Sequence, residues 1–185
     1  MDIKFRVRGL KFDDGPKLIK LYYGYYDELR HGNKELGLTL FRKKPTYESE
    51  IDWFTGAYKG FLNGSKIAKV AEAGGKVVGL CDISTSRPDS EMDHVGLLGI
   101  AIMDGYRGSG IGTALIGAAL KEARAKFEIV RLGLFAGNER AMALYKKMGF
   151  VEYGRMPRAI KRGKRYFDEV FMYTDFGAKR PKRDT

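Results

Sequence analysis

Cysteine and histidine are nearly absent from this sequence. One cysteine, Cys81, and 2 histidines occur among 185 residues. A lone cysteine excludes an internal disulfide framework and is typical of a protein from a reducing compartment. No Cys/His spacing typical of a zinc site occurs either, so we expect no metal.

Long hydrophobic runs are also missing. The longest, VGLLGIAIM at residues 95–103, is far shorter than the roughly 20 residues that a membrane-spanning helix needs. The opening MDIKFRVRGLKF alternates charged with apolar residues and lacks the apolar core of a signal peptide. We therefore expect a cytoplasmic protein with no membrane partner.

Acidic residues are scarce relative to basic ones, whereas glycine is abundant. The sequence has 34 Lys and Arg against 23 Asp and Glu, a net charge of +11, and 24 glycines. Such a charge attracts anions, which include nucleic acid, acidic proteins and phosphorylated small molecules, without distinguishing among them. The glycines indicate tight turns and close backbone approaches.

The hydrophobic periodicity predicts the order β-α-α-β-β-β-α-β-α-β-β. The first helix starts at Asp13 or Asp14 before Pro16, the second follows a Thr46 cap, and Gly74-Gly75 joins a hairpin. We expect an α/β (α+β) fold, with a mixed, mostly antiparallel central sheet of about seven strands and helices on both faces. The predicted strands are 4–9, 66–73, 76–83, 94–103, 129–135, 150–160 and 164–174, and the later helices are 112–126 and 138–149.

Burial, one turn and the domain bounds can also be predicted. The strand at 94–103 is mostly apolar, so we expect it to be buried on both faces. The last two strands should be joined by a turn at Lys161–Gly163. Residues 1–176 should form a single domain, followed by a basic, disordered tail at 177–185.

The stretch RGSGIG, Arg107 to Gly112, lies between the strand at 94–103 and the next helix. Glycines let a phosphate approach the main chain, and the amides at a helix start attract an anion. The stretch therefore predicts a diphosphate site, with a tight turn that binds nothing as the alternative. The dinucleotide fingerprint fits poorly because it belongs to a first βα turn, and no GK[ST] follows to make a P-loop.

Two sequence blocks resemble one known family. IMDGYRGSGIGTALI is similar to the acyl-CoA signature of the GNAT N-acetyltransferase superfamily, of form (Arg/Gln)-x-x-Gly-x-(Gly/Ala). LGLFAGNERAMALYKKMGF (132–150) resembles the second block of that family, and KRYFDEVFMY resembles its closing strand. The resemblance covers about residues 1–176 and implies the acyl-CoA N-acyltransferase fold with acetyl-CoA as co-substrate.

The resemblance implies a set of cofactor-binding residues. Main-chain groups of Ile100, Ala101 and Ile102 would pair with the pantetheine arm, although plain core packing also explains these residues. Asn138 would contact the same arm, with a helix N-cap as the alternative. The loop residues implied around the pyrophosphate are Arg107, Gly108, Ser109, Gly110, Ile111 and Gly112.

The resemblance also implies direct attack of a primary amine on the thioester, with Tyr145 as general acid and as a neighbour of the cofactor. The alternative for Tyr145 is an apolar helix face shared with Ala141, Leu144 and Met148. For the general base, Glu91, Asp93 and His94 precede the cofactor strand, and we select His94 because imidazole titrates near neutrality. A surface turn explains these three equally well.

The acceptor stays open at this stage: a protein N-terminus or lysine, a polyamine or another small amine. Tyrosines of the first helix and the segment 31–45 could roof its pocket, although core packing also explains the aromatics. Two rival functions are a basic nucleic-acid-binding module and a regulatory domain that binds acyl-CoA without catalysis. No nucleic-acid-binding motif supports the first, so nucleic acid is not favoured as a partner. A homodimer is left open.

Overall fold

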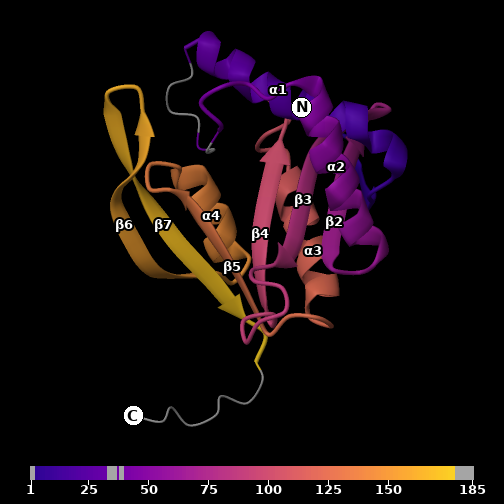
Figure 1. Ribbon diagram of the computed structural model, residues 1–185. Coiled ribbons are helices and arrows are strands. Elements are labelled where there is room, and N and C mark those ends of the chain that lie inside the picture. The colour runs from indigo at the N-terminus through magenta and orange to yellow at the C-terminus, as the bar shows by residue number, and fades with distance from the viewer. Residues whose placement is uncertain (1–2, 33–36, 38–39, 178–185) are drawn as a thin grey trace.

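The computed structural model describes residues 3–32, 37 and 40–177 (Figure 1). Except for Gly177, the predicted tail at 177–185 lies outside the described residues, as do residues 33–36 and 38–39 of the segment 31–45. The helices are α1 (Gly15–Arg30), α2 (Tyr47–Leu62), α3 (Ile111–Ala123) and α4 (Glu139–Lys147), with a 3-10 turn at Phe12–Asp14 before α1. The strands are β1 (Arg6–Gly9), β2 (Lys66–Ala73), β3 (Lys76–Thr85), β4 (Val95–Ile102), β5 (Ile129–Phe135), β6 (Val151–Arg162) and β7 (Arg165–Asp175).

Local signals position most of these elements. Thr46 caps α2 by accepting a hydrogen bond from the amide of Ser49, and Asn138 caps α4 in the same way from Ala141. The hairpin prediction is confirmed, since Gly74 and Gly75 both have positive φ between β2 and β3. The turn between β6 and β7 lies one residue later than predicted, at Gly163 and Lys164, because Arg162 still pairs with Arg165.

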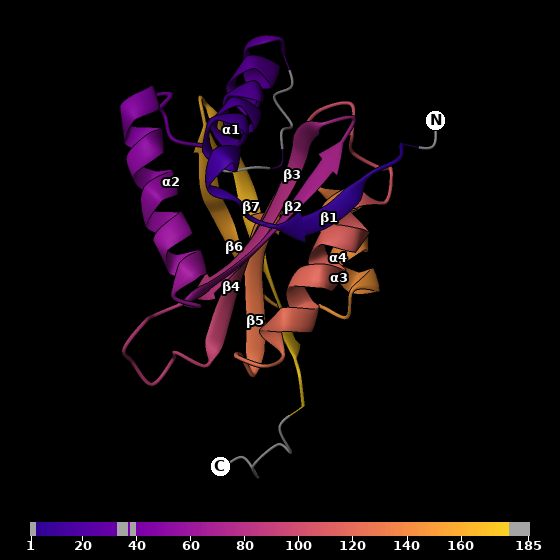
Figure 2. The same ribbon diagram turned by 90° about the vertical axis from the view of Figure 1, so that its right-hand side faces the viewer.

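The seven strands form one sheet in the order β1-β2-β3-β4-β5-β7-β6. Only β4 and β5 are parallel, so the predicted mixed, mostly antiparallel sheet is confirmed. Figure 2 shows α1 and α2 on one side of the sheet and α3 and α4 on the other. Within the described part of the chain, none of the helices has the length and apolar character needed to cross a membrane.

The parallel pair β4–β5 ends early. It joins Val95 to Ile129, Gly96 to Val130 and Leu97 to Arg131, after which the two strands separate. We call this point, just beyond Leu97↔Arg131, the fork. Figure 1 shows β4 and β5 together at their lower ends and diverging upward. The upper part of β4 therefore has a sheet neighbour, β3, on one edge alone.

One face of β4 is not buried, which corrects the prediction for 94–103. Leu98 lies in the core above α3, but Leu97 is 41% exposed and Gly99 is exposed as well. The reason is that α1 and α2 lie over β2 and β3, whereas β5 and β7 carry no helix on that side among the described residues (Figure 1). We call this uncovered side of β4, β5 and β7 the open face.

A buried ion pair fixes the start of the chain to the sheet. Asp14, 1% exposed, receives two hydrogen bonds from Arg8 of β1, at 2.7 and 2.8 Å, and one from the amide of Lys11 at 2.9 Å. Arg8 also contacts Glu72 of β2 at 2.9 Å. Burial alone would raise the pKa of Asp14, but the hydrogen bonds from Arg8 and Lys11 outweigh it and hold that pKa below its usual value.

Replacing Asp14 with Asn should therefore lower the free energy of unfolding by about 3 kcal/mol at neutral pH, because it leaves a buried guanidinium short of its partner. A carboxyl whose pKa is lowered in the folded state stabilises the fold above its unfolded value of about 4, and this contribution is lost as the pH falls through the folded value. Urea unfolding of wild type and Asp14→Asn should thus converge as the pH drops below about 4. The exposed neighbour Asp13→Asn is the matched control, and an equal loss in that variant would contradict the assignment.

Candidate active site at the fork between the central strands

The loop into α3 is built to leave amides free. Gly108 and Gly110 have φ of +80° and +86°, a conformation that side chains disfavour. Gly110 is the N-cap of α3 and has no side chain with which to cap the first-turn amides of Ile111 and Gly112. A Cβ on Gly108 would collide with the guanidinium of Arg140, so a cation from α4 lies against the loop. The loop therefore combines main-chain donors that no described side chain caps, the positive end of a helix and a nearby arginine.

The upper edge of β4 supplies further main-chain groups. The amide of Met103 bonds Val78 and that of Ser86 bonds the carbonyl of Val95, so the odd-numbered residues of β4 pair with β3. By alternation, Leu98 and Ile100 direct their amides and carbonyls toward β5, beyond the last paired residues. These two residues face the fork with their hydrogen-bonding groups.

The other two residues predicted on this strand are already engaged. Ala101 lies at an odd position opposite Leu80 of β3. Ile102 donates its amide to the hydroxyl of Tyr25 at 2.7 Å, and its carbonyl accepts from that hydroxyl at 2.9 Å. Of the predicted trio, Ile100 alone directs unengaged main-chain groups toward the fork, and Leu98, which was not predicted, does the same.

The side chain of Arg107 points away from the glycines. It makes two hydrogen bonds to Glu28 of α1, at 2.8 and 2.6 Å, and a third to the carbonyl of Ile102 at 3.0 Å. The hydrogen bonds to Glu28 raise the pKa of Arg107, so the guanidinium stays charged. The side chain of Arg107 thus links α1 to the end of β4. Only the main chain of Arg107 belongs to the glycine loop. Ser109 also turns inward, donating to the carbonyl of Tyr106.

Asn138 and Tyr145 lie on α4, on the core side of the sheet. The side-chain oxygen of Asn138 caps the helix, and its amide nitrogen lies where a side chain on Gly37 would be. Tyr145 is 6% exposed, and its ring packs edge-on against Phe150 at 5.7 Å. Burial raises the pKa of Tyr145, so its hydroxyl keeps its proton at neutral pH. Its hydroxyl makes no hydrogen bond to any of the residues that the structure describes.

His94 lies at the closed end of the parallel pair. Its carbonyl accepts from the amides of Glu128 and Ile129, where β5 begins. Ile100 lies six positions further along the strand, a span of about 20 Å. Glu91 and Asp93 are exposed in the same turn. The structure therefore does not bring His94 together with Ile100 or the glycine loop.

Cys81 is poorly suited to act as a nucleophile. It is fully buried in β3, and burial raises the pKa of its thiol, so no reactive thiolate is available. Among the described residues, no group of three His, Cys, Asp or Glu side chains is close enough to hold a metal ion.

The open face holds a feature that the sequence reading missed. Gly99 of β4 and Gly133 of β5 each lie two residues beyond the last pair, Leu97↔Arg131, so they flank the fork at the same level. A Cβ on Gly99 would lie 3.2 Å from the carboxylate of Asp82, and one on Gly133 would collide with that of Glu169. Two carboxylates thus overhang the fork, one from each neighbouring strand. Only the strand register reveals them.

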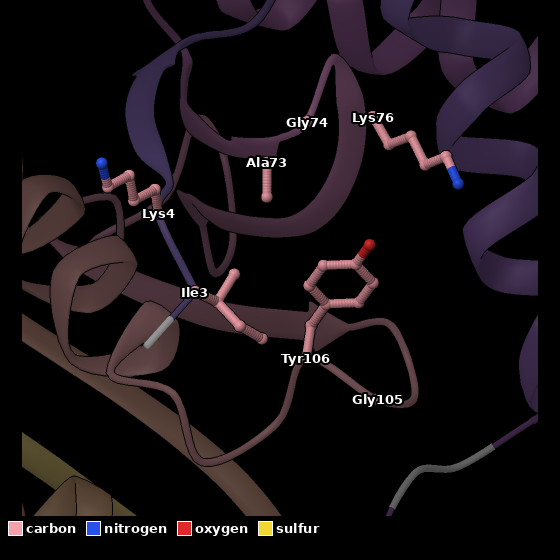
Figure 3. Close-up of a pocket in the computed structure, with 7 residues that line it drawn as sticks. All are labelled: Ile3, Lys4, Ala73, Gly74, Lys76, Gly105 and Tyr106. Carbon is pink, nitrogen blue, oxygen red and sulfur yellow. The ribbon is translucent and has the colours of Figure 1, made fainter. Parts of the chain in front are cut away.

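Two surface hollows lie near these elements. One, of about 480 Å³, is lined by Ile3, Gly105 and Tyr106, with Lys4 and Lys76 standing at opposite sides (Figure 3). It adjoins the start of the glycine loop and offers cations but no acid–base pair. The other, of about 360 Å³, lies between Leu29 of α1 and the turn from Arg162 to Phe167. It borders the open face.

The chain is similar to known acetyltransferases. The family model described as "Acetyltransferase (GNAT) family" matches residues 26–150. An L-methionine sulfoximine/L-methionine sulfone acetyltransferase of Pseudomonas aeruginosa is 28% identical over 122 residues, which are 65% of this chain and 69% of the relative. An uncharacterized N-acetyltransferase of Methanocaldococcus jannaschii is 35% identical over 152 residues, 80% of this chain and 61% of the relative.

Solved structures share the fold. A ribosomal-protein-alanine N-acetyltransferase from Brucella melitensis has a TM-score of 0.77 at 26% identity, covering 92% of this chain and 99% of that one. A GNAT superfamily phosphinothricin acetyltransferase from Sinorhizobium meliloti, in complex with AcCoA, has a TM-score of 0.79 at 21% identity, covering 100% of this chain and 96% of that one. With two thirds of its length matched by the family model and this fold around the fork, the chain belongs to the GNAT acetyltransferase family and is an N-acetyltransferase.

Proposed function

We propose that the protein transfers an acetyl group from acetyl-CoA to a primary amine by direct attack, without an acyl-enzyme. The observation that carries this proposal is the early end of the β4–β5 pair beside a glycine loop with free amides. Acetyl-CoA supplies the thioester, and the residues of this chain bind it, orient it and move protons.

The residues present fit acetyl-CoA. The amides from Gly108 to Gly112 and the guanidinium of Arg140 suit a diphosphate, because both favour negative charge. The free main-chain groups of Ile100 and Leu98 suit the amides of a pantetheine arm, which can pair with them like a short strand. An arm that runs from the loop along β4 brings the thioester toward the fork.

Tyr145 is the proposed general acid. Its hydroxyl holds its proton, lies on the core side of the sheet and has no hydrogen-bond partner among the described residues. Main-chain amides at the fork are the proposed donors to the oxyanion, because fixed dipoles in a partly dry site stabilise developing charge. The departing thiolate takes its proton from Tyr145.

The acceptor enters over the open face. This side carries no helix over β5 and β7 among the described residues, and the hollow beside Arg162 and Phe167 borders it. Its floor is aromatic, built from Phe135, Phe167, Phe171 and Tyr173. The acetyl donor approaches from the α3 side, so the two substrates meet at the fork from opposite directions.

The nucleic-acid and non-catalytic alternatives are less well supported. The basic residues are dispersed over several elements, among them Lys4, Lys76, Arg140 and the β6–β7 turn. The relative from Pseudomonas aeruginosa is named for an acetyl-transfer activity. An acetyl acceptor with a primary amine is therefore preferred to a nucleic acid.

Replacing Gly110 with Glu should lower acetyl-CoA affinity at least 100-fold, because a carboxylate would project where the diphosphate binds. Isothermal titration with acetyl-CoA measures this. Gly64→Glu is the matched control: Gly64 also has positive φ, at +74°, and open space around it. Both variants should lose similar stability from backbone strain, and equal affinities in the two would contradict the site.

Replacing Tyr145 with Phe should lower kcat about 100-fold and leave acetyl-CoA affinity within about twofold, because the ring packing survives and the proton donor is lost. Release of free thiol from acetyl-CoA is measured with four acceptors: L-methionine sulfone, a peptide beginning with alanine, a lysine peptide and spermidine. Unchanged kcat would show that another group protonates the thiolate. No turnover of any acceptor by wild type would contradict the proposed function.

A further inference from the structure

We infer that Glu169 of β7 is the general base that takes the proton of the acceptor ammonium. This inference rests on the proposed function and names a residue that no sequence motif singles out. The residue lies on the strand beyond β5, not at the start of the cofactor strand where His94 was expected.

Glu169 lies next to the fork. Glu169 pairs with Phe135 of β5, and its carboxylate lies over Gly133, where any side chain would collide with it. Gly133 is at the same level as Gly99, the first position on the open face beyond Leu97↔Arg131. Because Leu132 and Leu134 point into the core, Gly133 and the carboxylate above it lie on the open face. A glycine here gives the carboxylate access to the fork.

Glu169 also lacks a partner among the described residues. Glu169 is half-buried in a protein with 11 more basic than acidic side chains, yet its carboxylate makes no hydrogen bond or ion pair with any residue that the structure describes. Partly buried carboxylates are ordinarily paired, because leaving water without compensation costs free energy. Asp82, the other carboxylate at the fork, is held by Lys66 at 3.0 Å. Glu169 is therefore the one of these two that is ready to receive an ammonium.

Charged groups on the neighbouring elements have contacts of their own. On β7, Arg165 lies over the ring of Phe167 at 5.1 Å. On β5, Arg131 bonds the hydroxyl of Ser86 at 2.6 Å. Beyond Phe135, Arg162 lies over that ring at 4.9 Å. From α1, Glu28 pairs with Arg107. On β6, Met156 is the residue opposite Glu169. An incoming ammonium is thus the cation that matches this carboxylate.

The chemical step balances with the residues named. Glu169 takes one proton from the acceptor ammonium, and the freed lone pair forms the C–N bond at the thioester carbonyl. The C–S bond then breaks, and the thiolate takes the proton of Tyr145. The second proton of the nitrogen restores the Tyr145 hydroxyl, and the proton on Glu169 passes to solvent. The products are the N-acetylated amine, free coenzyme A thiol and one proton.

The test compares Glu169→Gln with wild type, using whichever of the four acceptors wild type turns over fastest. A general base contributes about 100- to 10,000-fold, so kcat should fall by at least 100-fold. Acetyl-CoA affinity and the thermal midpoint should stay close to wild type, because Gln has the same shape. In Glu169→Gln the acid limb of the kcat–pH profile should disappear. In Glu169→Ala, added formate should restore part of kcat. A merely structural role of Glu169 predicts neither result.

Asp82→Asn is the comparison variant, since it removes the other carboxylate at the fork. It should keep the acid limb. Should wild type acetylate an acceptor while Glu169→Gln keeps its kcat and acid limb, the inference fails and the proposed function stands. The inference also fails, and the proposed function stands, if Asp82→Asn is the variant that loses the acid limb of the kcat–pH profile. Should wild type acetylate none of the acceptors, the proposed function fails and the base has no reaction to serve.

Discussion

The early separation of β4 from β5 is the constraint on which the rest of the site depends. Two parallel strands that part after three residue pairs leave main-chain donors and acceptors without sheet partners. The fold satisfies those of Ile102 with the hydroxyl of Tyr25 and the side chain of Arg107, which Glu28 holds in place. Those of Leu98 and Ile100 face the fork, beyond the last residues that pair β4 with β5. Main-chain groups that give up sheet partners at the fork are therefore suited to pair with a ligand, as proposed above.

The two sides of the fork differ in charge. On the α3 side, free amides, the N-terminus of a helix and Arg140 favour an anion. On the open face, Asp82 and Glu169 overhang Gly99 and Gly133 and favour a cation. Glycine has a distinct use on each side: positive φ in the loop, and room for a carboxylate on the strands. This separation suits a reaction that joins an anionic donor to a cationic acceptor.

The fold could be predicted because turns and helix caps depend on neighbouring residues. Part of the site could not be predicted, because it depends on how distant strands pair. The Gly74-Gly75 turn and the Thr46 and Asn138 caps act over two to four residues, so their patterns are visible in the sequence. The apolar run of β4 suggested burial on both faces. This prediction was wrong because the sequence does not show that the helices leave one side of β5 and β7 uncovered. The partners of Arg107 and Gly133 lie far along the chain, and only strand register brings them together.

The position of the fork also limits where a base can act. A nucleophile has to lie about 3 to 3.5 Å from the carbonyl it attacks, and its base within hydrogen-bond reach of the nucleophile. His94 sits where β4 and β5 are still paired, and a closed pair of strands has no room between them for a thioester. Groups on the neighbouring strands at the level of Gly99 and Gly133 lie beside the open part of the fork. Since Lys66 holds Asp82, the geometry favours a base on β7, which borders the open face proposed as the entrance for the acceptor.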